Sequence, residues 1–214
     1  MNRQPLKSSV TISYLTVKLQ NMEAQKWEEI LGALPVKDTE EDEEKRKEVW
    51  SIMDLDDSLS LSIFELEKGI AAITMTEDVF DCFPAVETAF RFVKKMSNED
   101  HDKENHESNN EDDKVEEDVV IEHPLLYSEF RHFLTVLRHY FTFCQIFEND
   151  DLDEGLQVSR EDFCCEDKQE KLKEHVGDIR DICEEFDALD RDNMGLLSFD
   201  VLIKWGLQNL NADI

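Results

Sequence analysis

The chain has 214 residues, 40% of them hydrophobic, which is enough to build one large core or two small ones. Its 52 Asp and Glu against 23 Lys and Arg give a formal net charge of −29. This charge argues against nucleic acid and anionic membrane surfaces as partners, because both select basic proteins. The five cysteines form no CxxC pair, so we expect them to be reduced, with Cys164 and Cys165 as helix-packing residues.

Residues 1–24 are a predicted N-terminal arm. They contain no apolar signal core, and no stretch of the chain is long enough for a transmembrane helix. Asn2 follows Met1 where myristoylation requires Gly, so we expect neither membrane insertion nor acylation, and a cytoplasmic location. Beyond the arm, apolar residues recur mainly at helical intervals and only 6 Gly and 4 Pro interrupt them. This pattern predicts an all-α fold.

Residues 54–65 have the oxygen spacing of an EF-hand calcium loop, and we call this motif hand 1. Its predicted ligands, at loop positions 1, 3, 5, 7, 9 and 12, are Asp54, Asp56, Ser58, the carbonyl of Ser60, Ser62 and Glu65. Position 6 holds Leu59 where Gly is expected, and a side chain in the left-handed conformation costs roughly 1–2 kcal/mol, or about one decade in affinity. Two interpretations stay open: a calcium site, or an EF-hand that keeps its fold without an ion.

Hand 2 has lost its loop. Residues 125–130 resemble the second half of an EF-hand with Glu129 at position 12, whereas residues 97–120 are strongly acidic and almost free of apolar side chains. Such a segment cannot offset the entropy of being ordered, so it predicts a disordered insertion. We favour a solvated loop over a tether for a basic partner or a diffuse calcium buffer, and we expect hand 2 to complete hand 1 without binding an ion.

Hand 3 has a loop over residues 151–162, fixed by the apolar anchors around it. Its predicted ligands are Asp151, Asp153, the carbonyl of Gln157, Ser159 and Asp162. Gly155 at position 5 supplies no side chain, and Asp at position 12 is shorter than the usual Glu. We therefore expect Mg²⁺ or weak Ca²⁺ binding. A register one residue earlier would place Leu152 at position 3, so we prefer the first.

Hand 4 has a loop over residues 190–201. Asp190 and Asp192 occupy positions 1 and 3, and Gly195 stands at position 6. Met194 and Val201 occupy positions 5 and 12 without side-chain oxygens, so we expect no tight calcium site here. The four hands predict two calmodulin-like lobes, an N-terminal one over residues 25–140 and a C-terminal one over residues 141–214.

The order of the hands, with the second one interrupted, resembles the flagellar calcium-binding proteins, or calflagins. The resemblance rests on Lys26-Trp27-Glu28-Glu29-Ile30, Leu34-Pro35, Val49-Trp50, Ala89-Phe90, Lys94-Lys95, Tyr127-Ser128-Glu129-Phe130-Arg131 and Ser198-Phe199-Asp200 followed by Trp205. It implies two EF-hand lobes, a flagellar or ciliary location and calcium-modulated association. The chain departs from the family in two ways: it lacks the acylated N-terminus of the membrane-bound members, and its first hand is better preserved than the two C-terminal hands that bind ions in the family.

The predicted EF-hand fold and the resemblance to calflagins leave two functions open. The first is a calcium-binding sensor or adaptor of a flagellum, cilium or axoneme that grips a basic or amphipathic helix of a protein partner. The alternative is a calcium-independent scaffold subunit of a ciliary or axonemal assembly. We expect no enzymatic activity, because the six histidines are scattered and fall into no catalytic pattern.

Overall fold

A computed structural model describes residues 26–75, 82–103, 123–147, 157–177 and 179–209, with the side chains of residues 98–103 excepted. The predicted N-terminal arm lies outside the described residues, and so do Asp151 and Asp153 of hand 3 and the acidic insertion from residue 104 to residue 122. The described chain is largely helical, and its short strands lie where EF-hand loops pair. The predicted all-α EF-hand fold is confirmed.

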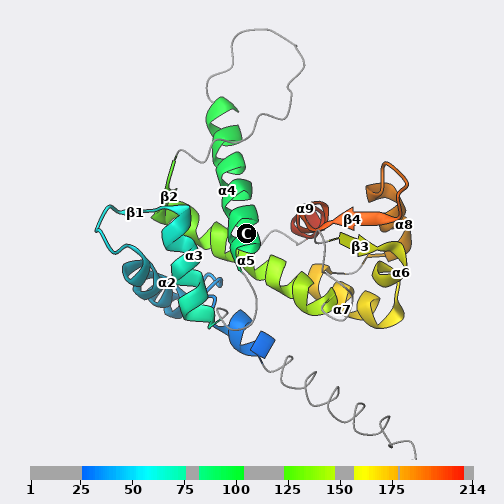
Figure 1. Ribbon diagram of the computed structural model, residues 1–214, viewed down its shortest axis with the longest axis horizontal. Helices are drawn as coiled ribbons and strands as arrows, with labels where there is room; N and C mark the ends of the chain where they lie inside the picture. The colour runs from blue at the N-terminus through cyan, green and yellow to red at the C-terminus, as the bar shows by residue number, and fades with distance from the viewer. Residues whose placement is uncertain (1–25, 76–81, 104–122, 148–156, 178, 210–214) are drawn as a thin grey trace, which may run out of the picture.

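A first helix covers residues 26–32, and its Trp27 and Ile30 are buried. The elements that follow are α2 (Glu40–Met53), β1 (Ser60–Leu61), α3 (Ile63–Thr74), α4 (Phe83–Lys103), β2 (Leu125–Leu126), α5 (Tyr127–Phe147), β3 (Gln157–Ser159), α6 (Arg160–Phe163), α7 (Glu166–Val176), α8 (Ile182–Leu189), β4 (Leu196–Ser198) and α9 (Phe199–Asn209). Hand 1 is thus α2, its loop and α3, while α4 and α5 flank the lost loop of hand 2 (Figure 1).

Two short antiparallel strand pairs join the hands. Strand β1 pairs with β2, with Ser60 opposite Leu126, so hand 1 is coupled to hand 2. Strand β3 pairs with β4, with Val158 opposite Leu197, and couples hand 3 to hand 4. Each pair buries apolar residues of the loop strands, Leu61 and Leu125 in one case and Val158 and Leu197 in the other.

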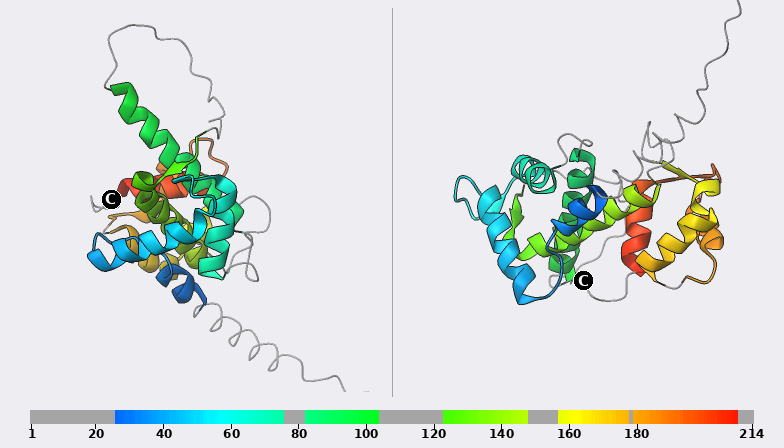
Figure 2. Two further views of the ribbon diagram at one scale, coloured as in Figure 1. Left: turned by 90° about the vertical axis from the view of Figure 1, so that its left-hand side faces the viewer. Right: turned by 90° about the horizontal axis from the view of Figure 1, so that it is seen from below.

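Helix α5 runs through both halves of the molecule. Figures 1 and 2 show it passing from β2, beside α2, α3 and α4, to the group formed by α6 to α9. The predicted boundary between the two lobes, at residues 140 and 141, falls inside this helix. Aromatic residues on α5 fill the core on either side: Phe130 packs edge-to-face on Trp50 of α2, and Phe147 stacks on Phe163 of α6.

Two expectations from the sequence are wrong. Helix α4 continues to Lys103, so the chain is still helical where the predicted disordered insertion was to begin, at residue 97. Cys164, which ends α6, forms a disulfide with Cys183 of α8, so the cysteines are not all reduced. Cys165 is exposed and free, and it precedes α7 rather than packing inside a helix.

Candidate metal site in hand 1

The ends of two helices position the first and last predicted ligands of hand 1. Asp54 is the C-cap of α2, a helix held in place by the buried side chains of Trp50 and Met53. Ser62 is the N-cap of α3 and forms a capping box with Glu65. In this box, Oε2 of Glu65 accepts hydrogen bonds from the Ser62 amide (2.9 Å) and from its hydroxyl (2.7 Å). The helix termini therefore fix both ends of the loop.

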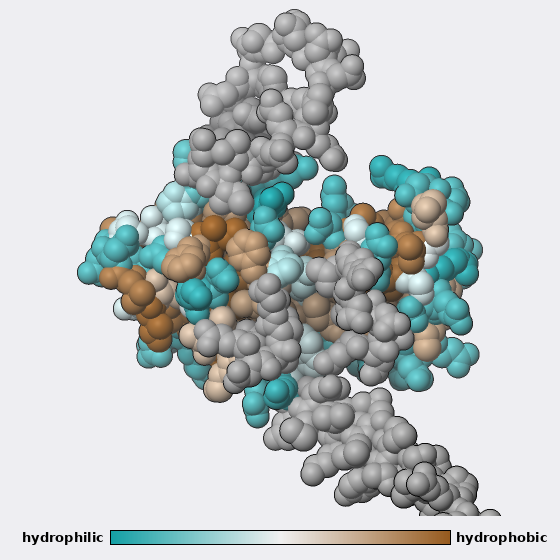
Figure 3. Space-filling model, in the orientation of Figure 1, coloured by the Kyte–Doolittle hydropathy of each residue, from teal (hydrophilic) through white to brown (hydrophobic). Residues whose placement is uncertain are grey.

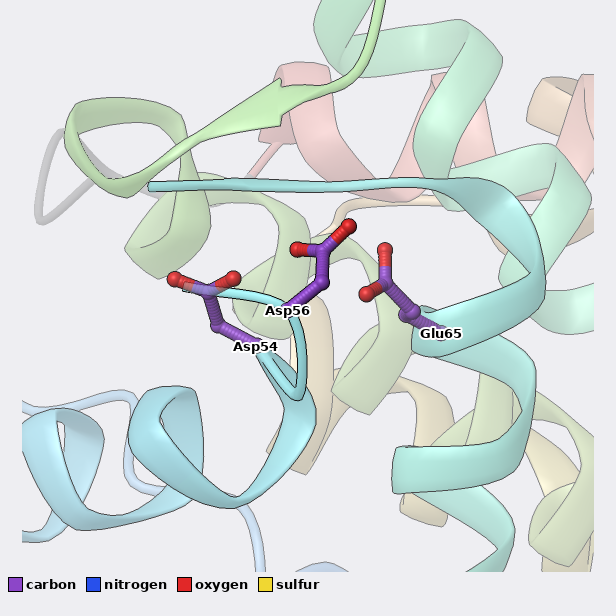
Figure 4. Close-up of side chains that lie close together, drawn as sticks. All are labelled: Asp54, Asp56 and Glu65. Carbon is purple, nitrogen blue, oxygen red and sulfur yellow. The ribbon is translucent and has the colours of Figure 1, made fainter. Parts of the chain in front are cut away.

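Three carboxylates meet at the centre of this loop. Oxygens of Asp54, Asp56 and Glu65 all lie within 4.8 Å of one another, and Figure 4 shows how the loop and the start of α3 bring them together. The other described residues contain no further group of three or more acidic, His or Cys side chains arranged in this way. Asp54 is only 7% exposed, so its charge lies partly away from water. Clustered carboxylate oxygens of this kind suit a hard divalent cation.

Backbone and hydroxyl donors organise the rest of the loop. The amide of Ser58 donates to Asp54 Oδ1 (2.9 Å), and the amide of Leu59 donates to Asp54 Oδ2 (3.1 Å). The Ser58 hydroxyl donates to the carbonyl of Ser60 (2.8 Å), which is the predicted ligand at position 7. Hydrogen bonds from the side chain and the backbone of Ser58 also lower the pKa of Asp56, which keeps this exposed carboxylate ionised.

Leu59, at position 6, has the left-handed conformation that the loop requires. Its φ is 62°, and Asp57 before it has a φ of 54°. The Leu59 side chain is 76% exposed, so no packing compensates for the backbone strain. The turn of the EF-hand loop is therefore made without glycine.

A cleft of about 650 Å³ adjoins the loop. Its lining includes the carboxylates of Asp56 and Glu65 and the apolar residues Phe64, Phe90 and Pro124. The cleft thus lies between the loop of hand 1, Phe90 of α4 and the segment before β2.

In hand 2, the carboxylate predicted at position 12 already has a cation beside it. Nζ of Lys94 on α4 lies 2.6 Å from Oε2 of Glu129 on α5. Burial acts to raise the pKa of Glu129, but hydrogen bonds from Lys94, from the Leu126 amide and from Ser97 outweigh it and hold the pKa below its usual value. Sequence reasoning missed this partner, because no motif links residues 35 positions apart.

In hand 3, the described ligands are also engaged within the protein. Asp162 and the N-cap Ser159 exchange hydrogen bonds, and Nζ of Lys168 lies 3.6 Å from Asp162 Oδ1. Gln157 is exposed on β3. The described part of this loop therefore brings only Ser159 and Asp162 together.

In hand 4, the carboxylate of Asp190 is nearly buried and holds the loop as Asp54 does in hand 1. It accepts hydrogen bonds from the amides of Met194 (3.1 Å) and Gly195 (2.8 Å), and Asp192 accepts a further one from Met194. The side chain of Met194 is exposed and Val201 is half-buried, so positions 5 and 12 offer no oxygen from a side chain.

A histidine pair that the sequence did not predict lies between α5 and α7. Nδ1 of His139 and Nε2 of His175 are 2.7 Å apart. Burial, then the neighbouring His175 and Arg138, lower the pKa of His139 to about 3. Burial, then Arg138, lower the pKa of His175 to about 4. Both rings are therefore neutral near pH 7 and form a hydrogen-bonded contact of the core.

Paired helix-loop-helix units, joined by short strand pairs, define the fold as an EF-hand fold. The family model of the FCaBP EF-hand domain matches residues 30–121, which include hand 1 and α4. The resemblance to flagellar calcium-binding proteins is therefore confirmed over this part of the chain. A search of curated proteins gave no significant match. In the part of the chain that the structure describes, no helix is both long enough and apolar enough to cross a membrane.

Proposed function

We propose that hand 1 binds Ca²⁺ and that the protein acts as a calcium sensor or adaptor. The observation that carries this proposal is the convergence of Asp54, Asp56 and Glu65 within 4.8 Å, on a loop whose other oxygens come from Ser58, Ser60 and Ser62. Together these residues supply the six protein positions from which an EF-hand takes its ligands. A smaller ion such as Mg²⁺ requires a more regular octahedron and serves as the competing ion in the test below.

Ion binding would act on helix α3. Glu65 uses Oε2 to cap α3 through Ser62, and an ion that takes both oxygens of Glu65 competes with these hydrogen bonds. Because the same Glu65 carboxylate faces Asp54 and Asp56 and caps α3, ion binding and the first turn of α3 would be linked through Glu65. Movement of the exit helix is the step by which sensor EF-hands expose apolar surface.

The partner that we propose is a basic amphipathic helix. Around hand 1, the side chains of Ile52, Leu55, Leu59 and Phe64 are each more than half exposed, which is an unusual density of exposed apolar residues next to an acidic loop. Figure 3 shows hydrophobic surface beside hydrophilic surface at this end of the molecule, over α2 and the loop. A helix with apolar and basic faces complements both the apolar residues and the net charge of −29. The name of the matched family supports a flagellar or ciliary location.

The second candidate is a calcium-independent scaffold of a ciliary assembly. It is favoured by hand 2, where Lys94 neutralises Glu129, and by hand 4, which lacks side-chain oxygens at positions 5 and 12. In this case hand 1 would be a structural remnant of the repeat, and partner binding would not depend on the ion.

Calorimetric titration with Ca²⁺ separates the two functions. We expect one saturable site in millimolar Mg²⁺ and physiological salt, with a dissociation constant of about 10⁻⁷–10⁻⁵ M, as in sensor EF-hands. Salt is needed because the charge of −29 attracts divalent ions diffusely. Glu65→Gln should abolish the site, whereas Glu44→Gln, which removes one charge from the exposed face of α2, should not. Absence of saturable heat in the wild type would overturn the sensor function and leave the scaffold.

A further inference from the structure

Lys94 and Glu129 form an ion pair that is almost removed from water. Their side chains are 12% and 13% exposed, and Nζ lies 2.6 Å from Oε2. Ser97 donates to the other carboxylate oxygen (2.7 Å), and the ammonium also lies 5.9 Å from the centre of the Phe90 ring. The carboxylate at position 12 of hand 2 is thus fully engaged without a metal ion.

The same carboxylate holds strand β2. The amide of Leu126 donates to Oε2 of Glu129 (2.8 Å), which is the oxygen that contacts Lys94. Leu126 lies opposite Ser60 in the β1–β2 pair. The carbonyl of Ser60 is the predicted position-7 ligand of hand 1. Hydrogen bonds thus link Lys94, Glu129 and Leu126, and the strand register places Leu126 opposite this ligand residue.

We propose that the Lys94 ammonium is a built-in replacement for the ion of hand 2, and that through Glu129 and β2 it positions the Ser60 carbonyl of hand 1. Lys94 is therefore a positioning residue for the ion of hand 1. The inference rests on the proposed function of hand 1 and deepens it. One half of the EF-hand pair is permanently charge-neutralised, so the pair takes a single ion and its binding curve has no cooperativity.

A similar arrangement recurs in hand 3. Nζ of Lys168 lies 3.6 Å from Asp162, at position 12, and 5.4 Å from the centre of the Phe147 ring. In both hands the ammonium lies between the position-12 carboxylate and a phenylalanine of the preceding helix. In hand 1, by contrast, the hydrogen-bond partners of Glu65 come from Ser62. Hand 1 is thus distinguished from hands 2 and 3 by a position-12 carboxylate whose described partners are uncharged.

The first test compares Lys94→Met with Lys95→Met, which removes the adjacent exposed lysine and serves as the matched control. We expect Lys94→Met to weaken Ca²⁺ binding at hand 1 by at least about fivefold relative to the control, the lower end of the usual coupling between sites. Equal affinity in the two variants would overturn the proposal.

The double variant Lys94→Met/Glu129→Met separates positioning from simple stabilisation. Replacing a buried ion pair by apolar side chains often restores stability. We expect the denaturation midpoint to recover toward that of the wild type, while Ca²⁺ affinity stays low because the Leu126 amide has lost its acceptor. Recovery of affinity together with stability would show that the pair only stabilises the fold.

Hydrogen exchange without added ion gives a readout that does not depend on calcium binding. The amide of Leu126 should exchange at least about tenfold faster in Lys94→Met than in Lys95→Met. Without the Lys94 ammonium, Glu129 is no longer held in place as the acceptor of this amide, so the strand opens locally more often. If the wild type bound no Ca²⁺, the proposed function of hand 1 would fail, and this exchange would still decide the role of Lys94. Unchanged exchange of Leu126 would exclude that role.

Discussion

The loops of hand 1 and hand 4 can be compared residue by residue, because their backbones follow the same course. Asp54 and Asp190 each accept hydrogen bonds from the amides at positions 5 and 6. Positions 4 and 6 have positive φ in both loops: 54° at Asp57 and 62° at Leu59, against 54° at Asn193 and 73° at Gly195. The two loops therefore share one conformation.

Their side chains differ in opposite ways. Hand 1 has oxygen donors at positions 5 and 12 but leucine at position 6, whereas hand 4 has the glycine but Met194 and Val201 in place of the donors. The shared backbone thus depends neither on the glycine nor on a complete ligand set. What the loops have in common is the carboxylates at positions 1 and 3, which accept hydrogen bonds from the loop amides, and a paired strand after the turn. The conformation of an EF-hand loop and a complete set of side-chain ligands are therefore separable in this chain.

The largest expected effect comes from giving hand 4 the side chains of hand 1. Met194→Asp with Val201→Glu completes the ligand set around Gly195, which already has the required conformation. In a Glu65→Gln background, we expect a new site with a dissociation constant of about 10⁻⁷–10⁻⁵ M, measured by calorimetry. Met194→Asp alone, which leaves position 12 without an oxygen, is the control. No binding by the double variant would show that the two loop backbones are not equivalent.

The next effect concerns the acid stability of the protein and the contact between His139 and His175. His139 of α5 is buried and contacts the half-buried His175 of α7, and their pKa values are lowered to about 3 and about 4, so the folded state resists protons that the unfolded state accepts. Stability is therefore lost as pH falls below about 6.5, by up to about 1.4 kcal/mol per pH unit for each histidine until the folded pKa is reached. Denaturant titrations between pH 6.5 and 4.5 measure this slope.

Substitution of one histidine tests the origin of that acid sensitivity. His175→Gln should reduce the slope, because it removes one group that takes up a proton on unfolding. His132→Gln, on the exposed side of α5, should leave the slope as it is in the wild type. Identical slopes in both variants would mean that the buried pair does not govern the loss of stability in acid.

The smallest effect exchanges the residues at position 6. Gly195→Leu should destabilise the protein by about 1–2 kcal/mol, because its φ is 73° although the space around its Cβ position is open. Leu59→Gly should relieve the same strain in hand 1 and tighten Ca²⁺ binding by up to about tenfold. Chemical denaturation and calorimetry check the two variants. Lack of any effect of Gly195→Leu would show that the left-handed residue is not strained.

Much of the fold was predictable from the sequence, since EF-hands are built from local patterns. The spacing of residues 54–65 placed the loop between the helices now seen as α2 and α3, and Ser62 with Glu65 has the spacing of a capping box. The extent of α4 was not predictable from composition. Its acidic end looks disordered in isolation, but extending a helix that is already packed requires little additional free energy per residue.

The contacts that the sequence missed all join residues far apart in the chain. Lys94 meets Glu129 across 35 positions, and His139 meets His175 across 36. The disulfide joins Cys164 and Cys183, which are 19 positions apart in the sequence. Neither spacing nor periodicity encodes such pairs, because they depend on how whole helices pack against one another.

The sequence by itself determined the kind of protein, since loop spacing and helical periodicity act over a few residues and survive in any context. It also located the three carboxylates that converge in hand 1. Only the tertiary structure decided which position-12 carboxylates remain without an internal cation. The packing of α4 on α5 places Lys94 beside Glu129, and α7 places Lys168 beside Asp162, whereas the described contacts of Glu65 come from Ser62. The physical reason is that charge neutralisation at these sites is set by distances between helices, which a linear motif does not contain.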